Sequence, residues 1–186
     1  VQALRAALAA HNLEACVVPS SDPHLSEYLP EHWQSRAWLS GFEGSAGTLV
    51  VTPSFAGLWT DSRYWEQADH DLAGSGIRTM RAGSDGVPSV VDWLARELPK
   101  GSRVALHGQA LSVSMHRNWQ STLDAGGIRL VCELDLPGEV WKDRPALPQA
   151  PVYEHKAPFA CRTRAGNLAA VRQSMAERKA DWHFIS

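Results

Sequence analysis

Apolar residues recur at two different spacings along the chain, and the change of spacing predicts successive helices and strands. In VQALRAALAAHN, Val1, Leu4 and Leu8 recur at intervals of three and four, which places them on one face of an α-helix. The continuous apolar run in LEACVVP predicts a buried strand that ends at Pro19. GTLVVT and AGLWT, joined by the short turn PSFAG, predict an antiparallel hairpin.

The alternation continues after the hairpin. Asp61 is a good N-cap for a helix through SRYWEQADHDL, because a short carboxylate accepts hydrogen bonds from first-turn amides. Next we expect a strand IRTMR, a helix PSVVDWLARELP with Pro88 near its first turn, a strand SRVALH, a helix over 112–125 and a strand GIRLVCEL. Gly126 and Gly127 stop that last helix, where a left-handed residue is needed. The order predicts an α/β fold, a mixed sheet with helices on both faces.

The composition changes after the last predicted strand. DRPALPQAPVYEHKAP contains four prolines, which favour extended backbone without internal hydrogen bonds. We therefore expect a first domain over 1–142, a Pro-rich linker over 143–158 and the opening helix and strand of a truncated second domain over 159–186. Leu168 and Val171 have helical spacing there, and WHFIS begins the expected strand. A lone helix and half a strand cannot bury their apolar faces, so we interpret the chain, which lacks an initial Met, as a fragment.

Composition limits the classes of function. The 186 residues are 44% hydrophobic and 20% charged, as in ordinary soluble proteins. A formal charge of -2 gives no attraction to nucleic acid or to an anionic membrane. No apolar run approaches the roughly 20 residues that span a bilayer, and the N-terminus has no secretory pattern. We therefore expect a cytoplasmic protein that binds neither nucleic acid nor membrane.

Cysteine and tryptophan usage add two expectations. Cys16, Cys132 and Cys161 are odd in number and lack CxxC spacing, which argues against a disulfide framework and a zinc site. We expect them to be small buried hydrophobic residues. Eight tryptophans are too many for the core of one small domain, so some of them are expected at an interface.

The glycine-rich segment SGFEGSAGTLVVT raises the question of a phosphate loop. A P-loop has four residues between its glycines and then Lys with Ser or Thr, whereas five residues separate Gly41 from Gly47 and Thr48 follows. A dinucleotide loop leads into a helix, but here a strand follows, and Glu43 would repel a pyrophosphate. We interpret the glycines as a tight turn into a central strand.

The segment SSDPHLSEY contains Asp22, His24 and Glu27, which suggest metal ligands or a Ser/His/Asp arrangement. No second cluster completes a coordination sphere, and HExxH is absent. Turn formation by Ser-Asp-Pro at the end of a strand explains the residues without a site. We favour this loop interpretation and keep a site complete within the chain as the alternative.

Arg63 lies in the first turn of the helix that Asp61 caps. The helix macrodipole disfavours a cation there by up to about 1 kcal/mol. Two interpretations stay open: Arg63 pairs with a carboxylate such as Asp61 or Glu66, or it reaches outward toward an anionic partner or a substrate.

Four segments carry a resemblance to a known family. PSSDPHLSEY, RAWLSGFEGSAGTLVVT, GLWTDSRYWEQA and EVWKDRPALP resemble, in order and spacing, the N-terminal domain of Xaa-Pro aminopeptidases of the longer, cytosolic type. AAVRQSMAERKADWHFIS resembles the start of that family's second domain. The resemblance implies a creatinase/prolidase-type N-terminal domain with a ribonuclease H-like motif, then a related second domain and a C-terminal pita-bread catalytic domain that this chain lacks.

The resemblance also implies a chemistry and a division of labour. The family removes an N-terminal residue that precedes proline, and it uses two divalent metals, commonly manganese, bound by two Asp, one His and two Glu of the pita-bread domain. We therefore assign no catalytic or metal-binding residue and no cofactor to this chain. The N-terminal domain is expected to shape substrate access and to contribute to a homodimer. Arg63 matches the family Arg placed toward the substrate cleft, which makes it the candidate substrate-binding residue.

Other functions stay open at this point. The same domain type occurs in prolidases, which require Xaa-Pro dipeptides, and in peptidase-like binding modules without catalysis. The motifs of the longer type favour the aminopeptidase. In either enzyme, we expect the 186-residue piece alone to be inactive, with or without manganese.

Overall fold

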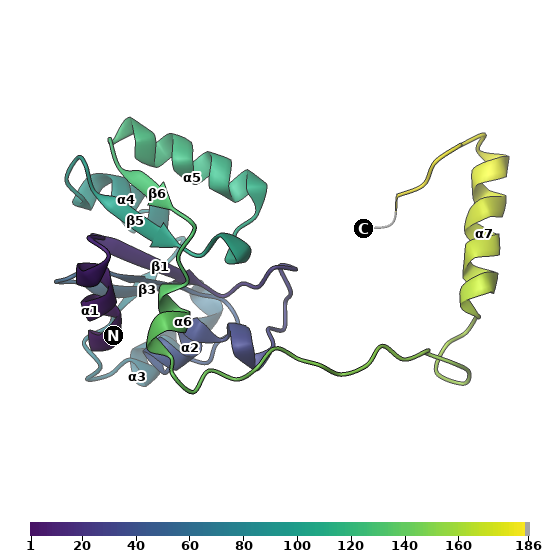
Figure 1. Ribbon diagram of the computed structural model, residues 1–186, viewed down its shortest axis with the longest axis horizontal. Helices are drawn as coiled ribbons and strands as arrows, with labels where there is room; N and C mark the ends of the chain where they lie inside the picture. The colour runs from purple at the N-terminus through teal and green to yellow at the C-terminus, as the bar shows by residue number, and fades with distance from the viewer. Residues whose placement is uncertain (185–186) are drawn as a thin grey trace. The chain divides into compact units, whose positions relative to one another are not determined.

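The computed structural model describes residues 1–184, which form two compact units, Val1–Pro148 and Gln149–Ser186. The first unit is an α/β domain around one sheet (Figure 1). Within residues 1–184, no helix is both long and apolar enough to cross a membrane. The predicted division into a first domain, a linker and a second domain stays a prediction.

Six strands form one mixed sheet in the order β4-β3-β2-β1-β5-β6. The strands are β1 (Ala15–Pro19), β2 (Thr48–Val51), β3 (Ala56–Thr60), β4 (Arg78–Arg81), β5 (Arg103–Leu106) and β6 (Arg129–Val131). β2 is antiparallel to β1 and to β3, which confirms the predicted hairpin, and the pairs β1–β5, β3–β4 and β5–β6 are parallel. β2 therefore runs against the other five strands. The ends of β1 and β3 and the start of β2 lie at one edge of the sheet.

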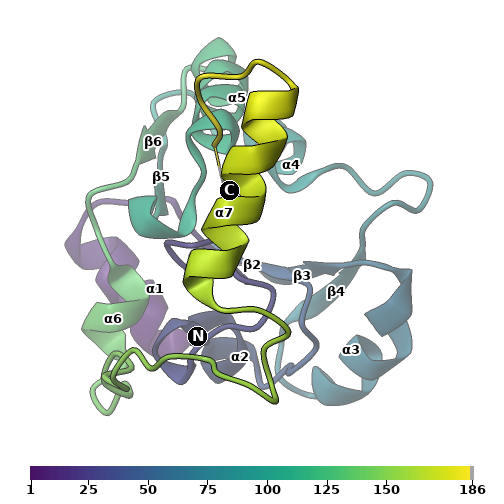
Figure 2. The same ribbon diagram turned by 90° about the vertical axis from the view of Figure 1, so that its right-hand side faces the viewer.

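Alternation of side chains along the buried strands explains the two-sided core. On one face, Cys16 and Val18 of β1 pack with the helices α1 (Gln2–Ala10) and α3 (Trp65–Asp71). On the other face, Ala15 and Val17 pack with α4 (Val90–Glu97) and α5 (Val113–Ala125). Because both faces are covered, the strands have continuous apolar runs. Figures 1 and 2 show the helices on the two sides of the sheet, which confirms the predicted fold class.

The helices of the first unit follow the predicted order with two additions. They are α1 (Gln2–Ala10), α2 (Ser35–Ser40), α3 (Trp65–Asp71), α4 (Val90–Glu97), α5 (Val113–Ala125) and α6 (Leu136–Val140). Leu4 and Leu8 of α1 are fully buried, as their spacing predicts. The sequence did not predict α2 and α6, because helices of six and five residues are too short to show a periodic apolar face.

Some element boundaries differ from those predicted from the sequence. Asp61 caps a short 3₁₀ helix, Ser62–Tyr64, and α3 begins only after it. Pro88 lies near the first turn as predicted, but α4 begins at Val90, after the N-cap Ser89, and not at Pro88. At the end of α5, Gly127 supplies the expected left-handed residue, with φ of 68°. β6 is shorter than the predicted strand GIRLVCEL.

The second unit contains the predicted helix, α7 (Arg164–Glu177), and Thr163 caps it through the amide of Gly166. No residue of α7 is buried within the unit. The strand expected at 182–186 is absent over 182–184, and its last two residues lie outside the described part. A strand requires a neighbouring strand, and residues 149–184 provide none.

Candidate functional site

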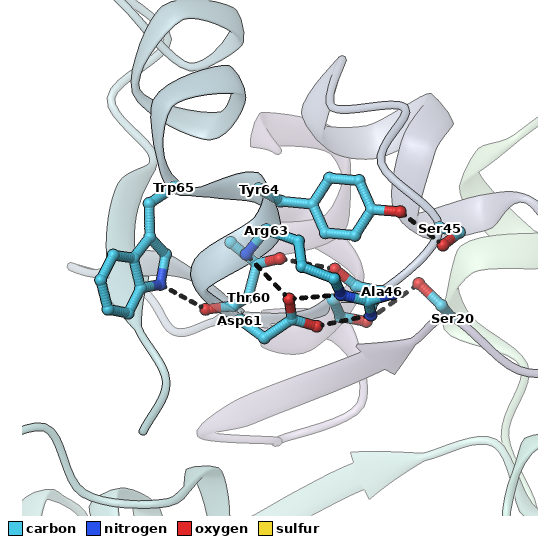
Figure 3. A network of polar contacts seen from close by, with 9 residues as sticks. Ser20, Ser45, Ala46, Thr60, Asp61, Arg63, Tyr64 and Trp65 are labelled. Carbon is cyan, nitrogen blue, oxygen red and sulfur yellow. Dashed lines mark hydrogen bonds and ion pairs between the residues drawn. The ribbon is translucent and has the colours of Figure 1, made fainter. Parts of the chain in front are cut away.

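The candidate site lies at the edge of the sheet where β1 and β3 end. After Thr60, the last residue of β3, Asp61 caps the 3₁₀ helix and Arg63 projects from that helix (Figure 3). The Nε and Nη2 atoms of Arg63 donate to the two carboxylate oxygens of Asp61, each at 2.9 Å. The backbone amide of Arg63 also donates to Asp61, at 3.1 Å. Of the two open interpretations, the structure shows the pairing of Arg63 with Asp61, and the substrate-side role stays a prediction.

The pairing changes the electrostatics of both groups and leaves Arg63 accessible. The hydrogen bonds from Arg63 lower the pKa of the Asp61 carboxyl, and those to Asp61 raise the pKa of Arg63. The Arg63 side chain is 68% exposed, and its guanidinium lies 5.2 Å from the centre of the Tyr64 ring. Its Nη1 donates to no group among residues 1–184. A fixed guanidinium with free donors can bind a carbonyl or carboxylate oxygen of a ligand.

A polar network joins the glycine-rich segment to this edge (Figure 3). The hydroxyls of Ser45 and Tyr64 are 2.8 Å apart, and the Thr60 hydroxyl donates to the carbonyl of Ala46 at 2.6 Å. The Trp65 indole donates to the carbonyl of Thr60 at 3.0 Å. Residues next to Arg63 in sequence are thus held by side chains and carbonyls from a separate loop.

Arg36 is the residue of this region that sequence reasoning missed. It is 6% exposed, and it donates to the Ser20 hydroxyl at 2.6 Å, to the Phe42 carbonyl at 2.6 Å and to the Gly44 carbonyl. Burial lowers the pKa of Arg36 to about 10. No carboxylate among residues 1–184 forms an ion pair with it. An arginine in a six-residue helix gives no sequence signal of burial.

These contacts explain the glycine-rich segment. A phosphate cradle directs backbone N–H groups at an anion, but here two carbonyls of the segment accept hydrogen bonds from a cation. Gly41 ends α2 in the left-handed region, with φ of 76°. The predicted tight turn is confirmed, and the segment leads into β2.

A cavity of about 360 Å³ lies beside this edge. It is lined by Ser20, Glu27, Tyr28, Leu29, Trp33, Gln34, Arg36, Ala37, Glu43 and Ser45. Ser45 bonds to Tyr64, and the charge of Glu27 contributes to raising the pKa of Arg63. Neither Arg63 nor Tyr64 lines the cavity, but each interacts with a residue that does.

The segment around Asp22 uses its carboxylate within its own loop. Asp22 is buried, and its Oδ1 accepts from the amides of His24 and Ser26, each at 2.9 Å, which are the contacts that the loop interpretation predicts. Among residues 1–184, no three His, Cys, Asp or Glu side chains converge as a metal site. The residues present therefore do not fit a dinuclear metal centre.

The cysteine prediction is only partly correct. Cys16 in β1 is buried, and burial raises the pKa of its thiol to about 12. Cys132 is half-buried just after β6, and Cys161 is exposed, so for Cys161 the prediction is wrong. Cys161 belongs to the second unit, which has too few residues to form a core. All three thiols are free.

Comparison with known proteins identifies relatives of the chain. Residues 1–132 match the family model of the creatinase/prolidase N-terminal domain. The chain is 39% identical to Xaa-Pro aminopeptidase ApepP of Drosophila melanogaster over 94% of this chain and 28% of that protein. It is 35% identical to Xaa-Pro aminopeptidase 2 of Homo sapiens over 93% of this chain and 26% of that protein.

A solved structure shows the same fold. The X-prolyl aminopeptidase of Caenorhabditis elegans, described as a cytosolic enzyme with a di-nuclear active site, matches with a TM-score of 0.77 and 34% identity. The match covers 91% of this chain and 28% of that one. The chain thus spans about a quarter of the length of these relatives.

Proposed function

Because the chain belongs to the creatinase/prolidase N-terminal domain family, we propose that it is the N-terminal part of a Xaa-Pro aminopeptidase. Such an enzyme releases the first residue of peptides that have proline in second position. The observation that carries the proposal is the similarity to Xaa-Pro aminopeptidases over 93% and 94% of this chain, beyond residue 132 where the family model ends.

Bond cleavage is assigned to the remainder of the protein. The chain spans only 26% and 28% of these relatives, and residues 1–184 offer no group of metal ligands. Two divalent metal ions, manganese by resemblance, would bind there and supply an activated water. In this proposal residues 1–142 limit substrate access and contribute to a homodimer. Residues 159–186 form the beginning of a second domain. The protein is proposed to be cytoplasmic.

Within this chain, Arg63 is the proposed substrate-binding residue. Its guanidinium is held by Asp61 on one side and is exposed on the other, and the neighbouring Tyr64 is hydrogen-bonded to Ser45, which lines the cavity. The paired edge is fixed, so little side-chain freedom remains to be lost when a ligand binds. We propose that the free edge donates to a carbonyl or carboxylate oxygen of the peptide substrate.

Substitution of Arg63 in the full-length protein tests this role. Arg63→Ala is expected to lower kcat/KM for a Xaa-Pro-Xaa tripeptide by about 10-fold or more, because a hydrogen bond from a charged donor contributes about 1.5–3 kcal/mol. Arg63→Lys should restore part of the loss. Arg96→Ala is the matched control, since Arg96 is also exposed and paired with a neighbouring carboxylate, that of Glu97.

The outcomes separate the possible functions. Unchanged kcat and KM in Arg63→Ala would remove the substrate-binding role but not the enzyme. Activity restricted to Xaa-Pro dipeptides would identify a prolidase. Absence of any Xaa-Pro cleavage by the metal-loaded full-length protein would favour a binding module without catalysis.

A further inference from the structure

A second hollow of about 330 Å³ lies between α2 and the segment that follows α6. Its lining includes Trp38, Trp141, Glu31, Glu43, Gln34 and Pro145, and we call it the tryptophan groove. We propose that the tryptophan groove binds the cationic side chain of an extended peptide, an arginine guanidinium or a lysine ammonium group.

The aromatic part of the groove presents an indole face. Trp38 and Trp141 stack with ring centres 4.9 Å apart and planes 8° from parallel. Trp141 is buried beneath the surface, whereas Trp38 is 41% exposed and is the most exposed tryptophan of the first unit. Among aromatic rings, the indole face attracts cations most strongly. The stacking partner fixes the orientation of the ring before any ligand arrives.

The rim of the groove supplies negative charge that forms no ion pair within the described part of the chain. Glu31 and Glu43 both line the groove, and neither forms an ion pair with any cation of residues 1–184. The nearby buried cation, Arg36, lines the adjacent cavity and not the groove, and its donors are occupied by a hydroxyl and two carbonyls. Free carboxylates beside an indole face complement a cation and not an anion or a neutral apolar group.

The position of the groove points to a peptide as the carrier of that cation. The tryptophan groove shares Gln34, Ala37 and Glu43 with the cavity of about 360 Å³ described above. The two hollows are therefore neighbours, and an extended chain can occupy both. That this peptide is the substrate rests on the proposed function; the binding of a cationic side chain does not.

Binding to the chain Val1–Ser186 tests the inference directly. The probes are acetyl-Gly-Arg-Gly-amide and its citrulline counterpart, which has nearly the same shape but no charge. The readout is the indole N–H resonances of ¹⁵N-labelled protein. We expect the arginine peptide to shift the Trp38 and Trp141 signals and to bind about fivefold tighter than the citrulline peptide, in the range of exposed cation–π and ion-pair contributions.

Variants locate the binding. Trp38→Ala is expected to weaken arginine-peptide binding about fivefold, and Glu31→Gln and Glu43→Gln about two- to threefold each. Trp182→Ala is the matched control, because Trp182 is 84% exposed but belongs to the second unit. Unchanged backbone amide spectra outside the groove will show that each variant is folded.

Three results would overturn the inference. They are the absence of any indole shift, equal binding of the two peptides, and self-association of the chain that Trp38→Ala abolishes, which would assign the groove to a second copy. The proposed function fails separately. If the full-length protein cleaves Xaa-Pro peptides but the chain binds no cation, only this inference falls; if the chain binds the arginine peptide but the full-length protein cleaves nothing, only the proposed function falls.

Discussion

Arg36 provides a sharp test of how the site edge is held together, through the substitution Arg36→Met. The methionine keeps most of the apolar stem but removes three hydrogen bonds from a charged donor, each contributing about 1.5–3 kcal/mol. Part of the stabilisation from these hydrogen bonds is offset in the parent protein. Burial lowers the pKa of Arg36 from 12.5 to about 10, which corresponds to about 3 kcal/mol against the charged form. The free energy of unfolding should therefore fall by about 2–5 kcal/mol.

The loss of stability should come mainly from the two carbonyls of the glycine-rich segment that accept hydrogen bonds from Arg36. The Ser20 hydroxyl still donates to the carbonyl of Gly47 in the variant, whereas the carbonyls of Phe42 and Gly44 lose their partner in a buried place. Arg36→Lys should lose about half as much, because one ammonium cannot reach all three acceptors.

Urea denaturation of the chain, followed by circular dichroism, measures the change. Arg117→Met is the control, because Arg117 is exposed on α5 and its side chain bonds to no group of residues 1–184; the variant should stay within about 0.5 kcal/mol of the parent. If Arg36→Met is as stable as Arg117→Met, the guanidinium does not hold the glycine-rich segment, and the account of this edge is wrong.

Two further predictions concern the fold. Burial lowers the pKa of His107, so the unfolded chain binds the proton at a higher pH than the folded chain does, and the free energy of unfolding should decline as the pH falls below 6.5. In urea denaturation at pH 7.5 and 5.5, the free energy of unfolding of His107→Gln should decline less than that of the parent. Equal declines in the two proteins would contradict this. Gly127→Ala should lower the free energy of unfolding by about 1–2 kcal/mol, because φ at this position is 68°. Gly126→Ala, where φ is -84°, should lower it by less in the same denaturation assay. Equal decreases for the two variants would refute the backbone argument.

The sheet could be predicted because its strands are buried on both faces. Runs such as LEACVVP and TLVV remain apolar throughout, and the turn PSFAG is too short for anything but a hairpin. Caps such as Asp61 could be predicted from local chemistry alone. Each of these signals involves only a few neighbouring residues, so it can be read from a single sequence.

The site depends on contacts that local patterns do not record. Arg36 meets Phe42 and Gly44 only after the glycine-rich segment turns back, and Trp38 meets Trp141 across about a hundred residues of chain. The pairing of Arg63 with Asp61 was one of two open interpretations, since spacing alone cannot say where a long side chain points. The surplus of tryptophans indicated an exposed indole but not which one; the interface itself stays a prediction.

The central claim is that this chain belongs to an enzyme whose bond-cleaving groups lie elsewhere in the protein. The most direct measurement compares release of the first residue from a Xaa-Pro-Xaa tripeptide by the purified full-length protein and by Val1–Ser186 alone, both with added Mn²⁺. We predict turnover by the full-length protein and none by the 186-residue chain. Turnover that rises in proportion to the concentration of the short chain, or none by the metal-loaded full-length protein, would contradict the account.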